Sequence, residues 1–339
     1  MPAVVAVSAG LGTEVGEVIH NSVEALVPKG VTLVNMNAAT PAHPSRHPLD
    51  ADAVLERIQD RVHLRGAAGT GVAPGSLEWV ASTGSTNTDL ADAWRSGASP
   101  VDRTVRLADE QVTARGRLGR AWSAPAGAQV IFSVLLRPDP GQITPEAFGE
   151  LPLLVGVAIA EAAREFGVPA VLKWPNDVVV LDDDSRFGYR KLAGILVEAA
   201  SVEPAVIIAG IGLNVSLTDE DFADAGIPDR SATSMITAGA TLPDTGARAD
   251  VAAAEITHLL AADAAWRGQG ADLEALRRRY RELSATLGTR VRAELPDGTQ
   301  LTGTAVDLGE HGELVIDTGA GQRRTVTAGD VVHLRPTGE

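Results

Sequence analysis

Three short basic segments contain the residues whose types and spacing could do chemistry. In residues 115–120 three arginines are interleaved with two glycines and a leucine, and residues 173–177 and 190–194 contribute Lys173 and Lys191. Guanidinium groups bind phosphate and carboxylate oxygens, and neighbouring glycines let backbone amides approach an anion closely. The chain as a whole has a formal net charge of -15. Local positive charge in an acidic chain predicts a site for a polyanionic small ligand, such as a nucleoside triphosphate.

Each of these segments also has an ordinary structural interpretation. A bare arginine and glycine hexapeptide is more often an exposed loop, although Trp122 beside it favours a binding site. Asn176 and Asp177 follow a proline, so alone they would form a turn; together with Lys173 they suit phosphate and Mg²⁺. Lys191 opens an apolar strand, where it either delivers charge to a pocket floor or keeps the strand edge soluble.

Weaker candidates lie on either side of these segments. Ser85 and Thr86 could bind a ligand carbonyl, but capping a helix would explain them equally well. Gly210, Gly212 and Asn214 end a strand that could admit a flat base, with a bulged strand end as the alternative.

Several kinds of active site are excluded or disfavoured. The chain has no cysteine, so it has neither a disulfide nor a thiolate nucleophile. Neither the Walker loop nor the G-x-G-x-x-G fingerprint is present, which disfavours kinases of those kinds. The seven histidines show no metal-ligand spacing, and a Ser-His-Asp triad has no support from spacing.

Composition limits the class and the location of the protein. At 339 residues the chain exceeds the roughly 250 to 300 residues of a single core, which predicts a main domain plus a smaller one. No apolar run approaches the roughly 20 residues of a membrane helix, and no basic residue precedes the mildly apolar start. We therefore expect a cytoplasmic protein with no membrane partner. The sequence pI of about 4.9 argues against nucleic acid as its main partner.

The pattern of hydrophobic and turn residues predicts three regions. Residues 1–75 are expected to be an extension and linker, partly disordered, with helical spacing in 49–58. A domain over 76–287 alternates strands with helices. Its expected strands are 105–108, 129–136, 170–173, 178–181, 192–198 and 206–211, and its expected helices are 86–94, 151–166, 251–266 and 273–287, the first opened by a capping box. Residues 288–336 are expected to form a small β-barrel of short strands and tight turns.

Taken in order, the motifs resemble those of the biotin protein ligases, also called holocarboxylase synthetases. The resemblance runs from about Ser76 to Leu334 and is carried by the segments 85–87, 111–122, 173–177, 191–196 and 210–214. It implies an α+β fold: a central mixed β-sheet backed by helices, similar to the class II aminoacyl-tRNA synthetase core, with a C-terminal SH3-like barrel. It also implies that biotin and MgATP give biotinyl-5′-adenylate, from which biotin passes to a lysine of a carboxyl carrier domain of an acetyl-CoA or related carboxylase.

The resemblance assigns roles by matching motif positions. Lys191, Arg117 and Asp177 are the implied catalytic residues, with Lys191 bridging the biotin carboxylate and the α-phosphate. The implied biotin site is formed by Ser85, Thr86, Asn87, Gln111, Arg115, Gly116, Arg117, Trp122, Lys191 and Gly194. The implied ATP site is formed by Arg117, Arg120, Trp122, Lys173, Asn176, Asp177 and Asn214, with Asn176 and Asp177 near Mg²⁺ or ribose and Asn214 reading adenine.

Two departures from the family pattern matter. Ala114 stands where the family usually has glycine, so a backbone that needs a positive φ there would be strained. Residues 1–45 contain one lysine and no arginine, which is too little charge for a DNA-binding repressor domain. We therefore predict a ligase that does not bind DNA. The alternatives are a lipoate or octanoate ligase or transferase on the related core, and a module that binds a nucleotide without turnover. The oligomeric state is left open, a homodimer included.

Overall fold

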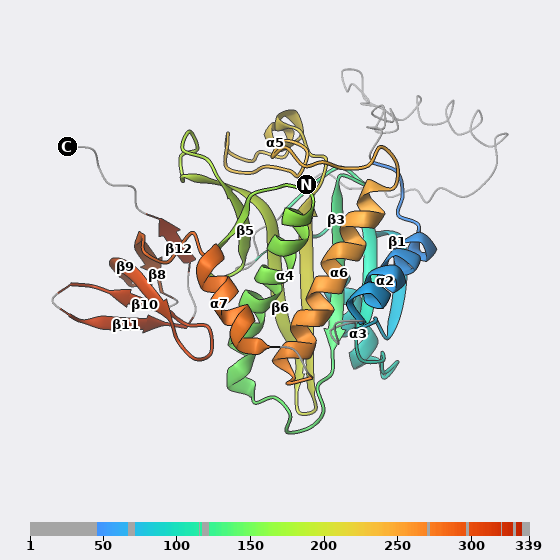
Figure 1. The fold of residues 1–339 in the computed structure, drawn as a ribbon, viewed down its shortest axis with the longest axis horizontal. Coiled ribbons are helices and arrows are strands. Elements are labelled where there is room, and N and C mark those ends of the chain that lie inside the picture. The colour runs from blue at the N-terminus through green and yellow to red at the C-terminus, as the bar shows by residue number, and fades with distance from the viewer. Residues whose placement is uncertain are drawn as a thin grey trace, which may run out of the picture. The chain divides into compact units, whose positions relative to one another are not determined.

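The computed structural model describes residues 46–66, 72–114, 116, 122–269, 272–295, 298–319, 321–327 and 330–333. All of them belong to one compact unit that spans His43–Glu339. A seven-stranded sheet and a five-stranded sheet form its framework (Figure 1).

The larger sheet is mixed and has the strand order β1-β2-β3-β7-β6-β5-β4. Only β1 and β2 run parallel; every other neighbouring pair is antiparallel. Its strands are β1 (Ser76–Thr83), β2 (Thr104–Gln111), β3 (Gln129–Leu136), β4 (Ala170–Lys173), β5 (Asp177–Leu181), β6 (Tyr189–Val202) and β7 (Ala205–Asn214). The two longest, β6 and β7, form a hairpin next to β3, and this central part of the sheet positions the site described below.

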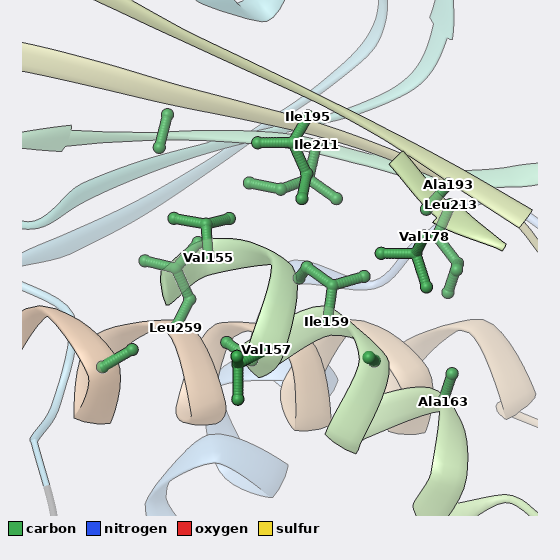
Figure 2. Packing of buried hydrophobic residues seen from close by; sticks show 14 of the residues in the cluster. Val155, Val157, Ile159, Ala163, Val178, Ala193, Ile195, Ile211, Leu213 and Leu259 are labelled. Carbon is green, nitrogen blue, oxygen red and sulfur yellow. The ribbon is translucent and has the colours of Figure 1, made fainter. Parts of the chain in front are cut away.

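Helices cover one face of this sheet and form the main core with it. In Figure 1, α4 (Leu151–Glu165) and α6 (Ala247–Trp266) cross the sheet side by side, flanked by α2 (Ala51–Gly66) and α7 (Leu273–Leu283). The first half of α4 is almost entirely apolar because sheet and helices surround it. Figure 2 shows Val155 and Ile159 of α4 directed towards Ile195 and Ile211 of the sheet.

The opposite face of the sheet is covered only in part. Helix α3 (Thr86–Arg95) packs Leu90 and Ala91 on Leu135, Val206 and Ile208 in a second, smaller core cluster. Side chains alternate along a strand. Along β7, residues 207, 209, 211 and 213 therefore face the helix layer, and residues 208, 210, 212 and 214 face the side of α3.

The second sheet is antiparallel and follows α7. It has the order β11-β10-β9-β8-β12, formed by β8 (Arg290–Glu294), β9 (Gln300–Leu308), β10 (Leu314–Asp317), β11 (Arg323–Val326) and β12 (Asp330–His333). Trp174 joins it to the larger sheet, because the indole Nε1 donates to the carbonyl of Gly312 at 2.9 Å. The α+β class with a small C-terminal β-domain is therefore confirmed.

The structure corrects one predicted boundary. We expected the main domain to begin near Ser76, but α2 packs on α6, and its Val54 and Ile58 are fully buried in the main core. Arg46, before α2, forms an ion pair with Asp221. A helical pattern was predicted here, but helical spacing alone does not show what a helix packs against. The compact fold therefore includes residues N-terminal to Ser76, while residues 1–45 lie outside the described residues.

The predicted capping box at the start of α3 is wrong. Ser85 is the N-cap residue but makes no side-chain capping hydrogen bond. Asp89 instead accepts a hydrogen bond from the Thr83 hydroxyl at 2.9 Å. The first amide of the helix, that of Thr86, donates to Oε1 of Gln111 at 2.8 Å, so a residue distant in sequence does the capping. Two short helices, η2 (Pro145–Glu150) and α5 (Asp219–Asp224), were not predicted.

Candidate active site

Two adjacent glycines leave a bare floor on the less covered face of the large sheet. Gly194 of β6 is paired directly with Gly212 of β7, and the same row continues to Asp177 on one side and Ile131 on the other. Directly paired residues project to the same face. A Cβ added at Gly212 would meet no atom within 4 Å, so the space above it is open. A flat ligand can therefore lie on the backbone between Asp177 and Ile131.

A β-bulge turns Lys191 towards this floor. The pairing of β5 with β6 shifts register so that Val178 faces Ala193 and Val179 faces Lys191. Leu192 and Ala193 consequently both belong to the core on the helix side, and Lys191 returns to the glycine side. Bulges of this kind re-aim side chains next to functional sites. A Cβ on Gly194 would lie 3.2 Å from the Lys191 Nζ, so this glycine also leaves room for the lysine.

Asp177 holds two ammonium groups at the edge of the floor. Its carboxylate lies 2.6 Å from Nζ of Lys191 and 3.8 Å from Nζ of Lys173. Lys173 is only 9% exposed, and its Nζ lies 5.9 Å from the centre of the Tyr189 ring. Burial, and secondarily the charge of Asp177, raise the pKa of the Tyr189 hydroxyl, which therefore stays neutral. The arrangement concentrates positive charge that an incoming anion can share.

Polar groups from α3 and β2 form a wall of the site beside the floor of Gly194 and Gly212. Oε1 of Gln111 accepts from the backbone amide of Thr86, and the Thr86 hydroxyl lies 2.7 Å from that of Ser133. Ser133 is paired in register with Gly210, which is two residues before Gly212 in β7. Ser85 precedes this helix end and is half-buried. The structure thus brings Ser85, Thr86 and Gln111 to the edge of the floor.

The amide side chains that the resemblance assigned to ligands already have protein partners. Nδ2 of Asn176 donates to the Ile195 carbonyl at 2.8 Å. Asn214 is 2% exposed; its Nδ2 donates to the Thr233 carbonyl at 2.9 Å, and its Oδ1 accepts from Gln129 at 2.7 Å. Asn214 therefore holds the 231–235 loop beside the site through its hydrogen bond to Thr233. Asn87 is also hydrogen-bonded within the protein, since its Nδ2 donates to Glu198.

The arginine segment is described only at its ends. Arg115, Arg117 and Arg120 lie outside the described residues, and Gly116 is exposed. The backbone amide of Trp122 donates to the Ala114 carbonyl at 3.3 Å, so the two ends of the segment lie together.

The residues at the two ends of this segment, Ala114 and Trp122, differ in their local structure. The Trp122 ring packs against a small cluster that includes Leu217 and Phe222. Ala114 does not have a positive φ, so alanine is not strained at this position.

A separate hollow of about 330 Å³ lies on the helix side of the same strands. Ile195, Val197 and Ile207 line it, together with Phe148 and Asn176. Its described lining includes none of the lysines and not Asp177. Among the described residues, Lys173, Lys191 and Asp177 of the sequence motifs lie together on the glycine face.

Sequence reasoning missed three polar residues on this face: Gln129, Ser133 and Glu198. Ser133 had a detectable signal, because it is a lone hydroxyl within the otherwise apolar segment 130–136. Glu198 had none, since a glutamate near the end of a predicted strand is usually solvated.

Comparison with known proteins identifies the family of this chain and agrees with its fold. Residues 79–214 match the model of the biotin/lipoate A/B protein ligase family, and residues 286–334 match the biotin protein ligase C-terminal domain. The fold and site thus define a ligase of the biotin and lipoate class. The chain is also 39% identical over 290 residues to a biotin--[acetyl-CoA-carboxylase] ligase of Mycobacterium tuberculosis, an alignment that covers 84% of this chain and 99% of that one. The chain therefore belongs to the biotin protein ligase family, as its motifs predicted.

Two more distant proteins are similar over part of the sequence or in the fold. A bifunctional ligase/repressor of Bacillus subtilis is 30% identical over 231 residues, which cover 66% of this chain and 65% of that one. A biotin protein ligase from Aquifex aeolicus, solved with biotin and ATP, aligns with a TM-score of 0.58 at 24% identity and covers 77% of this chain and all of that one. At that identity the structural match supports the fold. The absence of DNA binding remains a prediction, because residues 1–45 lie outside the described residues. No helix in the described ranges is long and apolar enough to span a bilayer.

Proposed function

We propose that this chain activates biotin with ATP and transfers it to a lysine of a biotin carboxyl carrier domain. The observation that carries the proposal is the pairing of Asp177 with both Lys173 and Lys191 beside the bare floor of Gly194 and Gly212. The floor suits the planar ureido ring of biotin, and the lysines suit a carboxylate that meets a phosphate. The carrier is proposed because the M. tuberculosis relative is named for acetyl-CoA carboxylase.

In the first step, a biotin carboxylate oxygen attacks the α-phosphorus of ATP, and pyrophosphate leaves with the electrons of the broken P–O bond. No enzyme nucleophile takes part. We propose that Lys191 neutralises charge on the two oxyanions as they approach and that Lys173 binds the phosphates; the family resemblance assigns Arg120 to the phosphates as well. Such a reaction depends on positioning and on fixed charge directed at the developing oxyanion.

In the second step, the carrier lysine attacks the acyl carbon of the adenylate and AMP leaves. The amine must lose a proton to form the amide. Asp177 is the carboxylate beside the acyl phosphate, and we propose that it orients this amine once the ligand has drawn the lysines away. Arg117 is assigned to this step by the family resemblance, as a residue that contacts the adenylate.

The remaining assignments follow from the positions in the site. Gln111 and the helix end at Ser85 and Thr86 would contact the ureido ring. The contact of Asn176 with ribose or Mg²⁺ rests on the family resemblance alone, because its Nδ2 donates to the Ile195 carbonyl and the residue lines the hollow on the helix side. Within the described part of the chain, no group of three His, Asp or Glu residues forms a metal centre. We therefore propose that Mg²⁺ arrives with the ATP phosphates, which supply its main oxygen ligands.

One assay tests the proposal and its alternative. The protein is incubated with MgATP, biotin and a recombinant carrier domain, and the carrier is analysed by mass spectrometry. The expected result is the mass gain of one biotin on one lysine, together with release of pyrophosphate. The matched family model also covers lipoate ligases, so parallel reactions contain lipoate and octanoate. Modification by either of these, with none by biotin, would overturn the proposal.

A further inference from the structure

A continuous chain of hydrogen bonds runs from an exposed carboxylate to the wall of the site. Nδ2 of Asn87 donates to Glu198 Oε2 at 2.6 Å, and Oδ1 of Asn87 lies 2.6 Å from the hydroxyl of Ser133. Ser133 is 2.7 Å from the hydroxyl of Thr86, which in turn is 3.1 Å from Oε1 of Gln111. The chain therefore connects β6, α3, β3 and β2.

The two amide side chains in this chain, those of Asn87 and Gln111, have fixed orientations. Gln111 must present Oε1 to Thr86, because the Thr86 backbone N–H donates to it at 2.8 Å. Asn87 must direct Nδ2 away from Ser133, because this nitrogen also donates to the Leu196 carbonyl at 3.2 Å as well as to Glu198. A carbonyl and an ionised carboxylate can only accept. The Asn87 oxygen is therefore the atom that faces Ser133.

These orientations decide where the two hydroxyl protons lie. The Ser133 hydroxyl has one proton and must donate it to Oδ1 of Asn87. Otherwise two acceptor oxygens would face each other at 2.6 Å. The Thr86 hydroxyl then has two acceptors for its single proton, the Ser133 oxygen at 2.7 Å and Oε1 of Gln111 at 3.1 Å. Thr86 has no second proton, so its oxygen can act towards a ligand only as an acceptor, while the NH₂ of Gln111 remains a donor.

Burial prevents water from reversing this order. Ser133 is 0% exposed, Thr86 2% and Asn87 7%. The sheet also leaves space for the chain, because a Cβ on Gly210 would lie 2.1 Å from Oδ1 of Asn87. An unmade hydrogen bond in such a place is costly, so each proton has one favoured position.

We propose that Glu198, Asn87 and Ser133 are positioning residues that set the hydrogen-bond polarity of the ligand site. They hold Thr86 as an acceptor beside the Gln111 donor. The site thereby selects a ligand edge with an N–H next to a C=O, as a cyclic urea presents. This inference rests on the proposed function, since biotin carries such a urea.

The test compares biotin with two isosteric analogues, each with one ring N–H replaced by oxygen. Dissociation constants are measured by calorimetry for the wild-type protein, Ser133→Ala and Glu198→Gln. In Ser133→Ala the Thr86 hydroxyl loses its nearer acceptor and keeps Oε1 of Gln111 at 3.1 Å, which already accepts from the Thr86 amide, so its proton can turn towards a ligand acceptor. In Glu198→Gln a neutral amide can also donate to Asn87, so Nδ2 of Asn87 keeps only its longer bond to the Leu196 carbonyl, at 3.2 Å, among these two partners, and the reversed order becomes accessible once that bond breaks. The controls are Thr257→Ala, which removes a buried hydroxyl in α6, and Glu203→Gln, which removes a carboxylate near the tip of the same hairpin.

For the wild-type protein and both controls we expect one analogue to bind at least roughly 30-fold more weakly than biotin. In Ser133→Ala and Glu198→Gln this ratio should fall below about 5-fold, because Thr86 can then donate to the ring oxygen. Glu198 is exposed, so its variant keeps the test valid if Ser133→Ala does not fold. An unchanged ratio in a folded Glu198→Gln protein would overturn the proposal even though biotin binds. Failure of the wild-type protein to bind biotin would overturn the proposed function, and with it the ligand class inferred here.

Discussion

Replacing Lys191 with alanine should abolish most of the chemistry while leaving the fold intact. Its Nζ is 2.6 Å from Asp177, and the two side chains are 34% and 19% exposed. Partly solvated ion pairs contribute about 1 kcal/mol or less, and Asp177 retains Lys173 at 3.8 Å. The melting temperature should therefore change by no more than about 2–4 °C.

The expected catalytic loss is much larger. A unit charge about 4 Å from an oxyanion contributes about 4 kcal/mol at an effective dielectric constant of about 20. Losing one such fixed charge at a reacting centre typically lowers the rate by roughly 10²–10³-fold. The assay is single-turnover release of pyrophosphate from MgATP and biotin, with thermal unfolding measured on the same sample. Release within about threefold of the wild-type rate, from a folded variant, would refute the role of Lys191.

The neighbouring residue supplies the control for this experiment. Arg190→Ala removes a cation one position away, and Arg190 pairs with Asp182 at 2.8 Å. This variant should release pyrophosphate at nearly the wild-type rate. An equal loss in both variants would mean that adenylation depends on the general charge of β6 and not on the position of Lys191.

Three further predictions concern the fold around the site. Gly212→Ala should leave the melting temperature nearly unchanged but weaken biotin binding, measured by calorimetry. Gly210→Ala places a Cβ 2.1 Å from a buried amide oxygen and should lower the free energy of unfolding in urea by about 1–3 kcal/mol. Ile58→Ala should cost about 2–5 kcal/mol in urea unfolding, because Ile58 is 0% exposed. The hydrogen bond from His258 is the main cause that lowers the pKa of Glu165 from 4.5 to about 2, so Glu165 stabilises the fold fully above about pH 4.5 and loses this contribution as the pH falls towards 2. Since Glu165 is 35% exposed, solvent screening limits the contribution to about 1 kcal/mol.

Each of these predictions has a matched comparison. The two glycine variants serve as controls for each other, and equal stability would contradict the packing described at Gly210. For Ile58 the control is Gln59→Ala, an exposed neighbour on α2; if both variants unfold at the same urea concentration, α2 does not contribute to the core. For the pH effect, the stability difference between wild type and Glu165→Gln should shrink as the pH falls from 5 to 3, and a constant difference would contradict the assigned hydrogen bond.

The sequence by itself determined the elements of the fold and the kind of chemistry. Apolar runs bounded by glycine, proline or aspartate located every strand from β2 to β7, because short-range backbone preferences and hydrophobic periodicity are local properties. The order of the motifs, from the segment at 85–87 to that at 210–214, also indicated the correct family. These signals do not depend on which elements become neighbours.

The tertiary structure decided which residues meet. Gly194 and Gly212 are 18 positions apart, and only the register of β6 against β7 makes them one floor. The bulge that turns Lys191 towards Asp177 arises from the pairing with β5, which no local pattern specifies. Likewise, the hydrogen bond between Asn87 and Glu198 spans 111 positions of the sequence. Register, bulges and buried polar contacts are set by packing between distant segments, so the predicted cations could be identified from the sequence but their positions relative to one another could not.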